Sequence, residues 1–330
     1  MRAVTGPSEG VSALLQVISF CAVNCYAIIS GYVCYKEEKS GCYYAKYLKF
    51  WTPIFVYNVG ITICFYIFTS DIVSIKDIVK ATLPVTTYEY WYVNAYTALF
   101  FLIPWINRFV YNVSKKELNQ LICILFMLFS FYSTFSNLIS DTFNLRDGYS
   151  FFWLVILYII GAWIKKNRVN EKGGRLFWVG LICSCIAITW IWRMFAPIAN
   201  GLFLSYMSIT IVLIGVGFVV IFSRIKLNAV MVSLVRIFSP AAFGVYLIHE
   251  QNLVRDFLIQ DSFFWIANSR TWLVPFEVIG CAGLIFIGCL CIEKVRLLLF
   301  EVLGINRLIV VLEKKLDSML NKGLDRICGK

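Results

Sequence analysis

The sequence contains a single histidine, His249, and few charged residues of any kind. Asp, Glu, Lys and Arg make up 15% of the 330 residues, whereas about a quarter is usual in soluble domains. No pair of histidines and no C-x-x-C spacing occurs, so a zinc centre lacks support. The nucleotide patterns G-x-x-x-x-G-K-[ST] and G-x-G-x-x-G, the hydrolase pattern G-x-S-x-G and any repeat of fixed period are absent too. These absences argue against nucleotide hydrolysis, dinucleotide binding, a hydrolase elbow and a solenoid.

Apolar residues, in contrast, are abundant. They make up 60% of the chain, aromatic residues make up 17%, and the mean hydropathy is +0.77. This composition predicts an integral membrane protein. The twelve cysteines lie mostly inside apolar runs and are interpreted as small buried hydrophobic residues. The formal charge of +11 comes from short basic clusters between apolar runs, which favours membrane topology over nucleic-acid binding as its explanation.

Nine segments are long and apolar enough to cross a bilayer, which takes about 20 residues of helix. They lie near residues 12–35, 50–69, 90–111, 118–136, 149–164, 176–192, 203–223, 237–258 and 271–292. The predicted fold is therefore all-α, a polytopic membrane helix bundle of about nine transmembrane helices plus a C-terminal amphipathic helix. Residues 1–293 are assigned to the membrane domain and residues 294–330 to a basic cytoplasmic tail.

The basic residues fall on alternate sides of these segments. One set of connections holds 23 of the 30 basic residues with nine acidic ones, and the other holds seven basic and ten acidic residues. The positive-inside rule makes the first set cytoplasmic. We therefore predict a multi-pass protein of the cell (inner or plasma) membrane, with the N-terminus as given outside and the C-terminus in the cytoplasm.

Two further segments are predicted to be helical without spanning. Residues 72–83 are too short and carry three charged residues, so they are placed at the outer surface or re-entering slightly. In the tail, leucines recur every four residues beside lysine and arginine, which is typical of a basic helix on the cytoplasmic leaflet; a solvated coil or a partner helix is the alternative. These leucines are Leu308, Leu312, Leu316, Leu320 and Leu324.

The single histidine lies in the eighth predicted span. Tyr246, His249 and Glu250 share one helical face there, and Arg255 follows toward the outer end. A polar cluster on a spanning helix must face protein or water, and a neutral imidazole suits general acid–base chemistry near neutral pH. A lone buried histidine can equally satisfy a hydrogen bond between helices, and both readings stay open at this stage.

Two other groups of residues are candidates for binding. Lys46 and Lys49 lie three residues apart at the start of the second span, where an anionic cofactor could dock from the cytoplasm; the positive-inside signal alone also explains them. Between Tyr88 and Phe109, aromatic residues such as Trp91 and Tyr96 gather at the outer interface. They form either an aromatic belt or a platform for sugar rings.

Five stretches of the sequence are distinctive when taken in order. They are "AVNCYAIISGYVCY" (22–35), "YYAKYLKFWTP" (43–53), "YWYVNAYTALFFLIPWINRFV" (90–110), "FFWLVILYIIGAWIKK" (151–166) and "FSPAAFGVYLIHEQNLVR" (238–255). Together they resemble the integral-membrane acyltransferase 3 family, most closely the branch that O-acetylates capsular and other surface polysaccharides. The resemblance runs from about residue 20 to about residue 290.

The resemblance implies transfer of an acetyl group from cytoplasmic acetyl-CoA to a hydroxyl of a surface or lipid-linked glycan, without a metal. Lys46 and Lys49 stand where the family usually has an R-x-x-R-like basic pair, and they would contact the cofactor phosphates. His249 and Arg255 match the family's Y-L-I-H segment. We expect His249 to be the catalytic proton carrier or a helix-to-helix ligand, and Trp91, Tyr96 and Arg255 to lie near the glycan.

The sequence departs from the family pattern at its front. Family members open with a further helix carrying an arginine and, about ten residues on, a histidine thought to be catalytic. We expect either that the start codon is placed too late or that the gene is a fragment, and we favour the first of these explanations. A transporter or flippase of lipid-linked sugars, and a catalytically inactive remnant of the acyltransferase, are the alternative functions.

Overall fold

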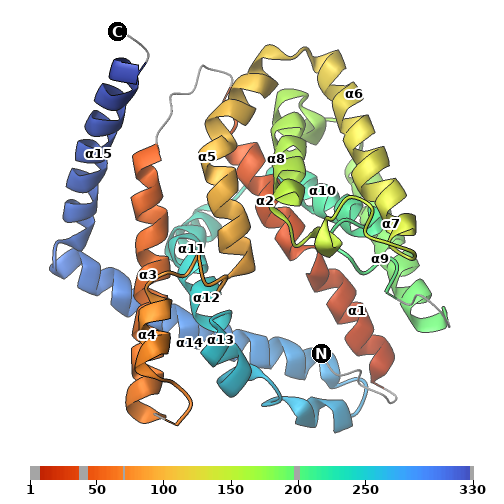
Figure 1. Ribbon diagram of the computed structural model, residues 1–330. Coiled ribbons are helices and arrows are strands. Elements are labelled where there is room, and N and C mark those ends of the chain that lie inside the picture. The colour runs from red at the N-terminus through yellow and green to blue at the C-terminus, as the bar shows by residue number, and fades with distance from the viewer. Residues whose placement is uncertain (1–7, 37–43, 70, 197–200, 328–330) are drawn as a thin grey trace. The chain divides into compact units, whose positions relative to one another are not determined.

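A computed structural model describes residues 8–36, 44–69, 71–196 and 201–327, without the side chains from residue 321 onward (Figure 1). Every regular element in these ranges is a helix, which confirms the all-α prediction. The chain divides into two compact units, each assembled from separate stretches of sequence. The first comprises residues 1–41, 92–226 and 267–275, and the second comprises residues 42–91, 227–266 and 276–330.

The first unit is built mainly from seven long helices and short turns among its described residues. Its elements are α1 (Glu9–Phe20), α2 (Ala22–Cys34), α5 (Trp91–Asn112), α6 (Lys115–Phe126), a π-turn (Met127–Tyr132), α7 (Ser133–Ser136), a 3-10 turn (Arg146–Gly148), α8 (Phe151–Lys166), a second 3-10 turn (Val169–Glu171), α9 (Arg175–Phe195) and α10 (Ile209–Ser223). Trp91, the first residue of α5, belongs to the second unit. Helices α8 and α10 bury most of their side chains and form the core of this unit.

Helices α2 and α8 cross at two glycines, which lets their backbones touch (Figure 1). A Cβ atom on Gly31 would overlap the carbonyl of Tyr158, and one on Gly161 would overlap the carbonyl of Ile28. Small residues at a crossing are the usual means of close helix packing in membranes, where apolar side chains gain nothing by leaving lipid. The pair therefore sets the distance between α2 and α8.

Several polar side chains inside the first unit bind backbone carbonyls or one another. The Tyr158 hydroxyl donates to Asn107 Oδ1 at 2.9 Å, and Asn107 Nδ2 donates to the carbonyl of Cys34 at 3.0 Å. At the end of α8, Lys165 Nζ donates to the carbonyl of Tyr35 at 2.7 Å, and Lys166 Nζ to that of Val110 at 2.6 Å. These lysines close helix ends whose carbonyls have no partner within the helix.

The second unit contains the predicted site residues His249, Lys46, Lys49, Trp91 and Arg255. Its elements are a 3-10 turn (Tyr44–Lys46), α3 (Tyr47–Phe68), α4 (Ile75–Ala81), α11 (Ala229–Phe238), a 3-10 turn (Ser239–Ala241), α12 (Ala242–His249), α13 (Asn252–Val254), a π-turn (Arg255–Ile259), most of a 3-10 turn (Phe264–Asn268), α14 (Val274–Val302) apart from its first two residues, and α15 (Ile305–Ile327). The predicted short helix over residues 72–83 is present as α4, and the Asn58 side chain ties α3 to it through the carbonyl of Ala81.

A buried carboxylate joins three helices of this unit. Glu293 of α14 is 1% exposed, and the Arg296 guanidinium forks onto it with two bonds of 2.6 and 2.7 Å. The Tyr57 hydroxyl of α3 donates to the same carboxylate. Gly244 of α12 lies against it so closely that a Cβ would overlap the carboxyl group. A buried charge is tolerated only when it is paired in this way.

The predicted eighth span, residues 237–258, is wrong as one continuous helix. The helical run that starts at Ala229 stops after His249, and Gln251 takes an extended conformation with φ −62° and ψ 130°. The Gln251 side chain accepts hydrogen bonds from the backbone N–H groups of Leu253 and Val254, at 2.8 and 3.2 Å. This cap begins a new helical turn, α13, and His249 is therefore the last residue of α12.

Six helical stretches in the described residues are long and apolar enough to span a bilayer, so the predicted count of nine is not confirmed. They are Glu9–Cys34, Tyr44–Phe68, Lys115–Ser136, Arg175–Phe195, Ala229–His249 and Val274–Val302. The predicted spans 149–164 and 203–223 correspond to α8, with 16 residues, and α10, with 15, which are too short for this criterion. Helix α5 has 22 residues, but its asparagines and Arg108 make it more polar.

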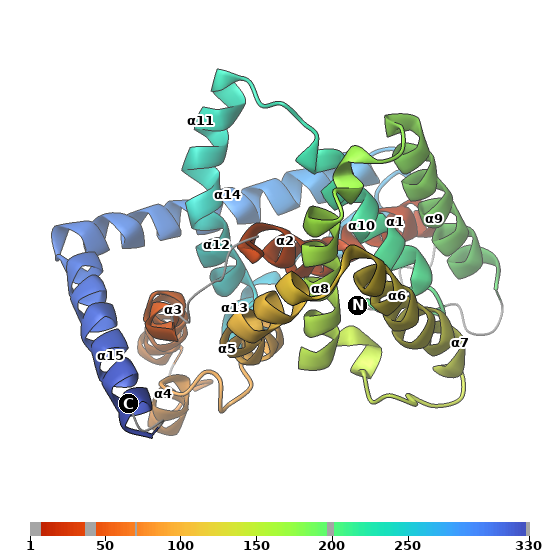
Figure 2. The same ribbon diagram turned by 90° about the horizontal axis from the view of Figure 1, so that it is seen from above.

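The predicted tail helix is present as α15. Helix α14 ends at Val302, beyond the predicted domain limit at residue 293, and the chain turns at Gly304, whose φ of 69° is in the left-handed region that glycine adopts freely. Helix α15 then runs beside α3 and the turn before it (Figures 1 and 2). Within this unit the tail helix therefore packs on its neighbours.

Replacing Gly161 by Ala tests the glycine crossing. The added methyl group must push α2 and α8 apart, so we expect the free energy of unfolding to fall by about 3 kcal/mol, seen as a lower thermal midpoint in detergent. Gly180→Ala in α9 is the control, because nothing lies within 4 Å of its Cβ position and alanine favours helix by up to about 1 kcal/mol. Equal midpoints for the two variants would contradict the crossing.

Replacing Glu293 by Ala tests the three-helix junction. Removal of the carboxylate leaves the Arg296 charge and the Tyr57 hydroxyl without their partner, so we expect a loss of about 3–5 kcal/mol in the free energy of unfolding. Glu301→Ala, an exposed acidic residue of the same helix, should change it by less than about 0.5 kcal/mol. Thermal unfolding in the same detergent measures both, and a stable Glu293→Ala variant would show that the junction is not needed.

Candidate functional site

His249 ends helix α12 directly before the break at Gln251. Its Nδ1 atom lies 2.7 Å from the carbonyl oxygen of Val245. Because a carbonyl can only accept, Nδ1 must carry the hydrogen, which leaves Nε2 of the neutral ring as a proton acceptor. The side chain is 36% exposed, so this nitrogen is not sealed in the core. The histidine is thus held by one ring nitrogen and open for chemistry at the other.

Tyr246 and Glu250 lie next to His249, as the predicted shared helical face requires. Glu250 Oε1 lies 3.7 Å from His249 Nε2, too far for a direct hydrogen bond but close enough to attract the positive charge of a protonated ring. The Tyr246 ring meets the imidazole edge-on at 6.1 Å between centroids. The structure therefore brings three of the predicted residues together, namely Tyr246, His249 and Glu250.

Glu89 and Tyr90, which the sequence did not single out, support this region from the loop before α5. Glu89 Oε1 accepts from the Gln251 side chain and from the Asn252 backbone N–H, both at 3.3 Å. Burial raises the pKa of the Glu89 carboxyl above its ordinary value, and the hydrogen bonds from Asn252 oppose this only in part. The buried Tyr90 hydroxyl donates to the carbonyl of Leu247 at 3.0 Å. Together they fix the helix break that carries His249.

Arg255 pairs with Asp256 and makes no hydrogen bond or ion pair with His249 in the described structure. It begins the π-turn after α13 and is exposed, and its Nε donates to Asp256 Oδ1 at 2.8 Å. Its guanidinium keeps further N–H groups beyond that pair. A contact with glycan stays a prediction for this residue.

Lys46 and Lys49 lie at the start of α3. Lys46 ends the 3-10 turn and occupies the N-cap position, Lys49 lies in the first helical turn, and both are exposed. Their spacing puts them on one side of the helix, as the sequence predicts. Two exposed ammonium groups this close can bind an anionic group as point charges.

The two aromatic candidates belong to different units. Trp91 belongs to the second unit and Tyr96 to the first, so each is described within its own unit. Tyr96 stacks on Tyr92 with centroids 6.0 Å apart. Asn94 lies between these two tyrosines in the sequence. Its side-chain amide is buried, and neither its oxygen nor its nitrogen makes a hydrogen bond in the structure, which is unusual for a buried polar group. Asn94 was not predicted and adds a polar group to this part of α5.

The residues that the sequence reasoning missed share one difficulty, because their partners are remote in the chain. Glu293 follows directly after the ninth predicted span, which ends at residue 292, and no role was predicted for it. The signal available was the apolar run "LLLF" after Arg296, which continues the helix past the charges and places a Glu–x–x–Arg pair inside it. Glu89 offered no comparable signal, because its partners lie more than 160 residues away.

Comparison with known proteins identifies a family for this chain. No curated protein and no solved structure matches the chain. A family model does match, the acyltransferase 3 model described as an acyltransferase domain, over residues 2–294. This match covers almost all of the predicted membrane domain, including His249, Lys46 and Lys49, and stops within α14. The chain belongs to the acyltransferase 3 family.

Proposed function

We propose that this membrane acyltransferase moves an acetyl group from cytoplasmic acetyl-CoA to a hydroxyl of a cell-surface or lipid-linked polysaccharide. The observation that carries the proposal is His249, whose Nδ1 is bound to the carbonyl of Val245 and whose Nε2 is left as acceptor at a helix break. A histidine held in this way is oriented for proton transfer. The family adds the reaction class, and the polysaccharide branch is inferred from the sequence resemblance.

The reaction needs one proton acceptor and one cationic contact. In the proposed step His249 Nε2 takes the proton of the sugar hydroxyl while the hydroxyl oxygen attacks the thioester carbonyl carbon. A C–O bond forms, the C–S bond breaks, and the coenzyme A thiolate leaves and regains a proton, so the products are the O-acetyl ester and coenzyme A. Glu250 stabilises the protonated ring across 3.7 Å. An acyl relay, in which another group first takes the acetyl group from the thioester, is the alternative to this direct attack.

The cofactor would be bound at the start of α3. Lys46 and Lys49 provide two positive charges for the phosphates of acetyl-CoA, as lysines do at other phosphate sites. Lysine lacks the planar fork of arginine, so we infer charge attraction with little directional grip. The charge distribution supports a cytoplasmic position for this end of α3 and a cytoplasmic C-terminus.

The glycan would lie near the break after α12. Within the second unit, Arg255 supplies N–H donors and Trp91 supplies an aromatic face, which suits sugar rings. Tyr96 belongs to the first unit, and for this residue a contact with glycan rests on the sequence resemblance. We place the protein in the cell membrane with several spans, consistent with its apolar helices.

Replacing His249 by Gln tests the proton acceptor. Glutamine is similar in length but cannot take the proton, so we expect the rate of glycan acetylation to fall by about 10²–10⁴-fold. Mass analysis of surface glycan from cells that express each variant measures the change. Gln260→Ala, an exposed residue of the following turn, is the control and should keep wild-type acetylation. Wild-type acetylation by a stably expressed His249→Gln variant would rule out this role.

The double variant Lys46→Ala/Lys49→Ala tests the cofactor contact. Loss of two charged phosphate contacts should raise KM for acetyl-CoA by about tenfold or more and leave kcat nearly unchanged. Initial rates in membranes over a range of acetyl-CoA concentrations separate the two constants. The control is Lys76→Ala/Lys80→Ala on α4, which removes the same charge from the same unit. An unchanged KM, or an equal change in the control, would refute the assignment.

A further inference from the structure

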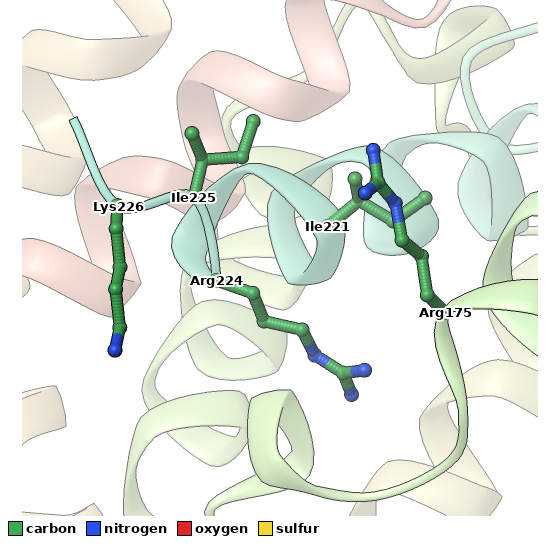
Figure 3. A pocket seen from close by; sticks show the side chains of 5 residues that line it. All are labelled: Arg175, Ile221, Arg224, Ile225 and Lys226. Atoms are coloured by element: carbon green, nitrogen blue, oxygen red, sulfur yellow. The ribbon is translucent and has the colours of Figure 1, made fainter. Parts of the chain in front are cut away.

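The first unit contains an open cleft with a strongly basic lining. Its volume is about 320 Å³, and it is lined by Arg175, Ile221, Arg224, Ile225 and Lys226 (Figure 3). Arg175 comes from the start of α9, whereas Arg224 and Lys226 come from the end of α10 and the segment that follows it. None of these residues belongs to the candidate site, so the cleft needs an explanation of its own.

The three cations of the cleft have no acidic partner among the described residues. The ion pairs in the described part of the chain involve none of Arg175, Arg224 and Lys226. Glu171, on the loop before α9, is exposed and takes part in none of them either. Uncompensated positive charge around one cleft attracts a negatively charged ligand.

Arg224 gives the cleft a defined shape. Its guanidinium donates to the carbonyls of Asn170, Lys172 and Gly173, the last at 2.9 Å, and so holds the loop before α9 against the end of α10. Figure 3 shows this side chain directed at the loop, whereas Arg175 turns toward Ile221. Arg175 and Lys226 make no recorded hydrogen bond or ion pair in the described structure. One cation therefore builds the cleft and two remain for a ligand.

The start of α9 adds to the positive potential. Gly174 occupies the N-cap position, and no side chain caps the helix there. The first amide N–H groups of a helix have no partner within it, and with the helix dipole they favour an anion. This contribution comes from the backbone and is independent of the three side chains.

The cleft also has an apolar lining. Ile221 and Ile225 provide it, Ile225 is 40% exposed, and the neighbouring Phe222 is 64% exposed. Ile221 lies in the last turn of α10, whose 15 residues are almost entirely apolar, and Ile225 follows the end of that helix. The cleft thus combines phosphate-binding groups with a surface suited to acyl chains, at a helix end that the charge distribution assigns to the cytoplasmic side.

We propose that this cleft binds an anionic phospholipid headgroup, with Arg175 and Lys226 as its cationic contacts and the two isoleucines along the upper acyl chain. Basic pockets between helices on the cytoplasmic side have the chemistry that such headgroups require. A soluble phosphate ester such as coenzyme A shares the phosphate but not the acyl chains. This proposal does not depend on the transfer reaction or on His249.

Native mass spectrometry of the full-length protein in detergent tests the proposal, with dioleoylphosphatidylglycerol and dioleoylphosphatidylcholine as probes. We expect the wild type to retain phosphatidylglycerol in preference to phosphatidylcholine. The double variant Arg175→Gln/Lys226→Gln should weaken phosphatidylglycerol binding by about 10–30-fold, as expected for two lost charge contacts. Both side chains are exposed, so we expect the variant to fold. Its thermal midpoint, compared with that of the wild type, checks this. The charge-preserving variant Arg175→Lys/Lys226→Arg should retain the lipid.

Lys115→Gln/Lys116→Gln is the matched control. These lysines belong to the same unit, at the start of α6, where the Asn167 side chain binds the carbonyl of Lys115, but they do not line the cleft. The control should bind phosphatidylglycerol like the wild type. Equal lipid binding by wild type and cleft variant, an equal loss in the control, or displacement of the lipid by coenzyme A at similar concentration would each overturn the proposal.

Discussion

The second unit depends on one buried carboxylate. Glu293 is surrounded by protein, and its charge is offset by the fork of Arg296 and the hydroxyl of Tyr57. Because Gly244 packs directly on the carboxyl group, the position of α12 is set five residues before His249. The same carboxylate joins α3, which begins near Lys46 and Lys49, to α14. One interaction therefore positions both helices that carry the candidate site.

The first unit solves the same problem of polar groups in apolar surroundings by different means. Glycines at the crossing of α2 and α8 let two backbones meet, and side-chain amides and lysines bind the carbonyls that helix ends leave unpaired. In lipid each of these groups would otherwise remain without a partner. The lysines that mark the predicted cytoplasmic side thus also serve as helix caps, and Arg224 has the same role beside the basic cleft.

The sequence was most informative where a property repeats along the chain. Apolar runs revealed most helices, and the spacing of Tyr246, His249 and Glu250 predicted the face that the structure contains. The break at Gln251 was not predictable, because it depends on a side-chain cap and on Glu89, which lies far away in the sequence. Glu293 was left outside the ninth predicted span because a charged residue after about 20 apolar ones normally ends a span. Three predicted spans are not confirmed: α8 and α10 are short helices with many buried residues, and α5 is long enough but more polar.

The site combines features that an acyl transfer between two sides of a membrane requires. A proton acceptor lies at a helix break, and a pair of cations lies at the start of another helix that the same junction holds. Carboxylate, tyrosine and glycine keep this arrangement together without taking part in the chemistry. The family membership over residues 2–294 gives the reaction class, and the roles of His249, Lys46 and Lys49 are the ones proposed above.

The most direct test supplies acetyl-CoA labelled in its acetyl group to membranes from cells with and without the gene, in the presence of the surface polysaccharide. The account predicts that label enters the polysaccharide only when the gene is present and that mild alkali releases it, as expected for an ester on a hydroxyl. Gene-independent labelling, or label that remains bound after alkali, would contradict it.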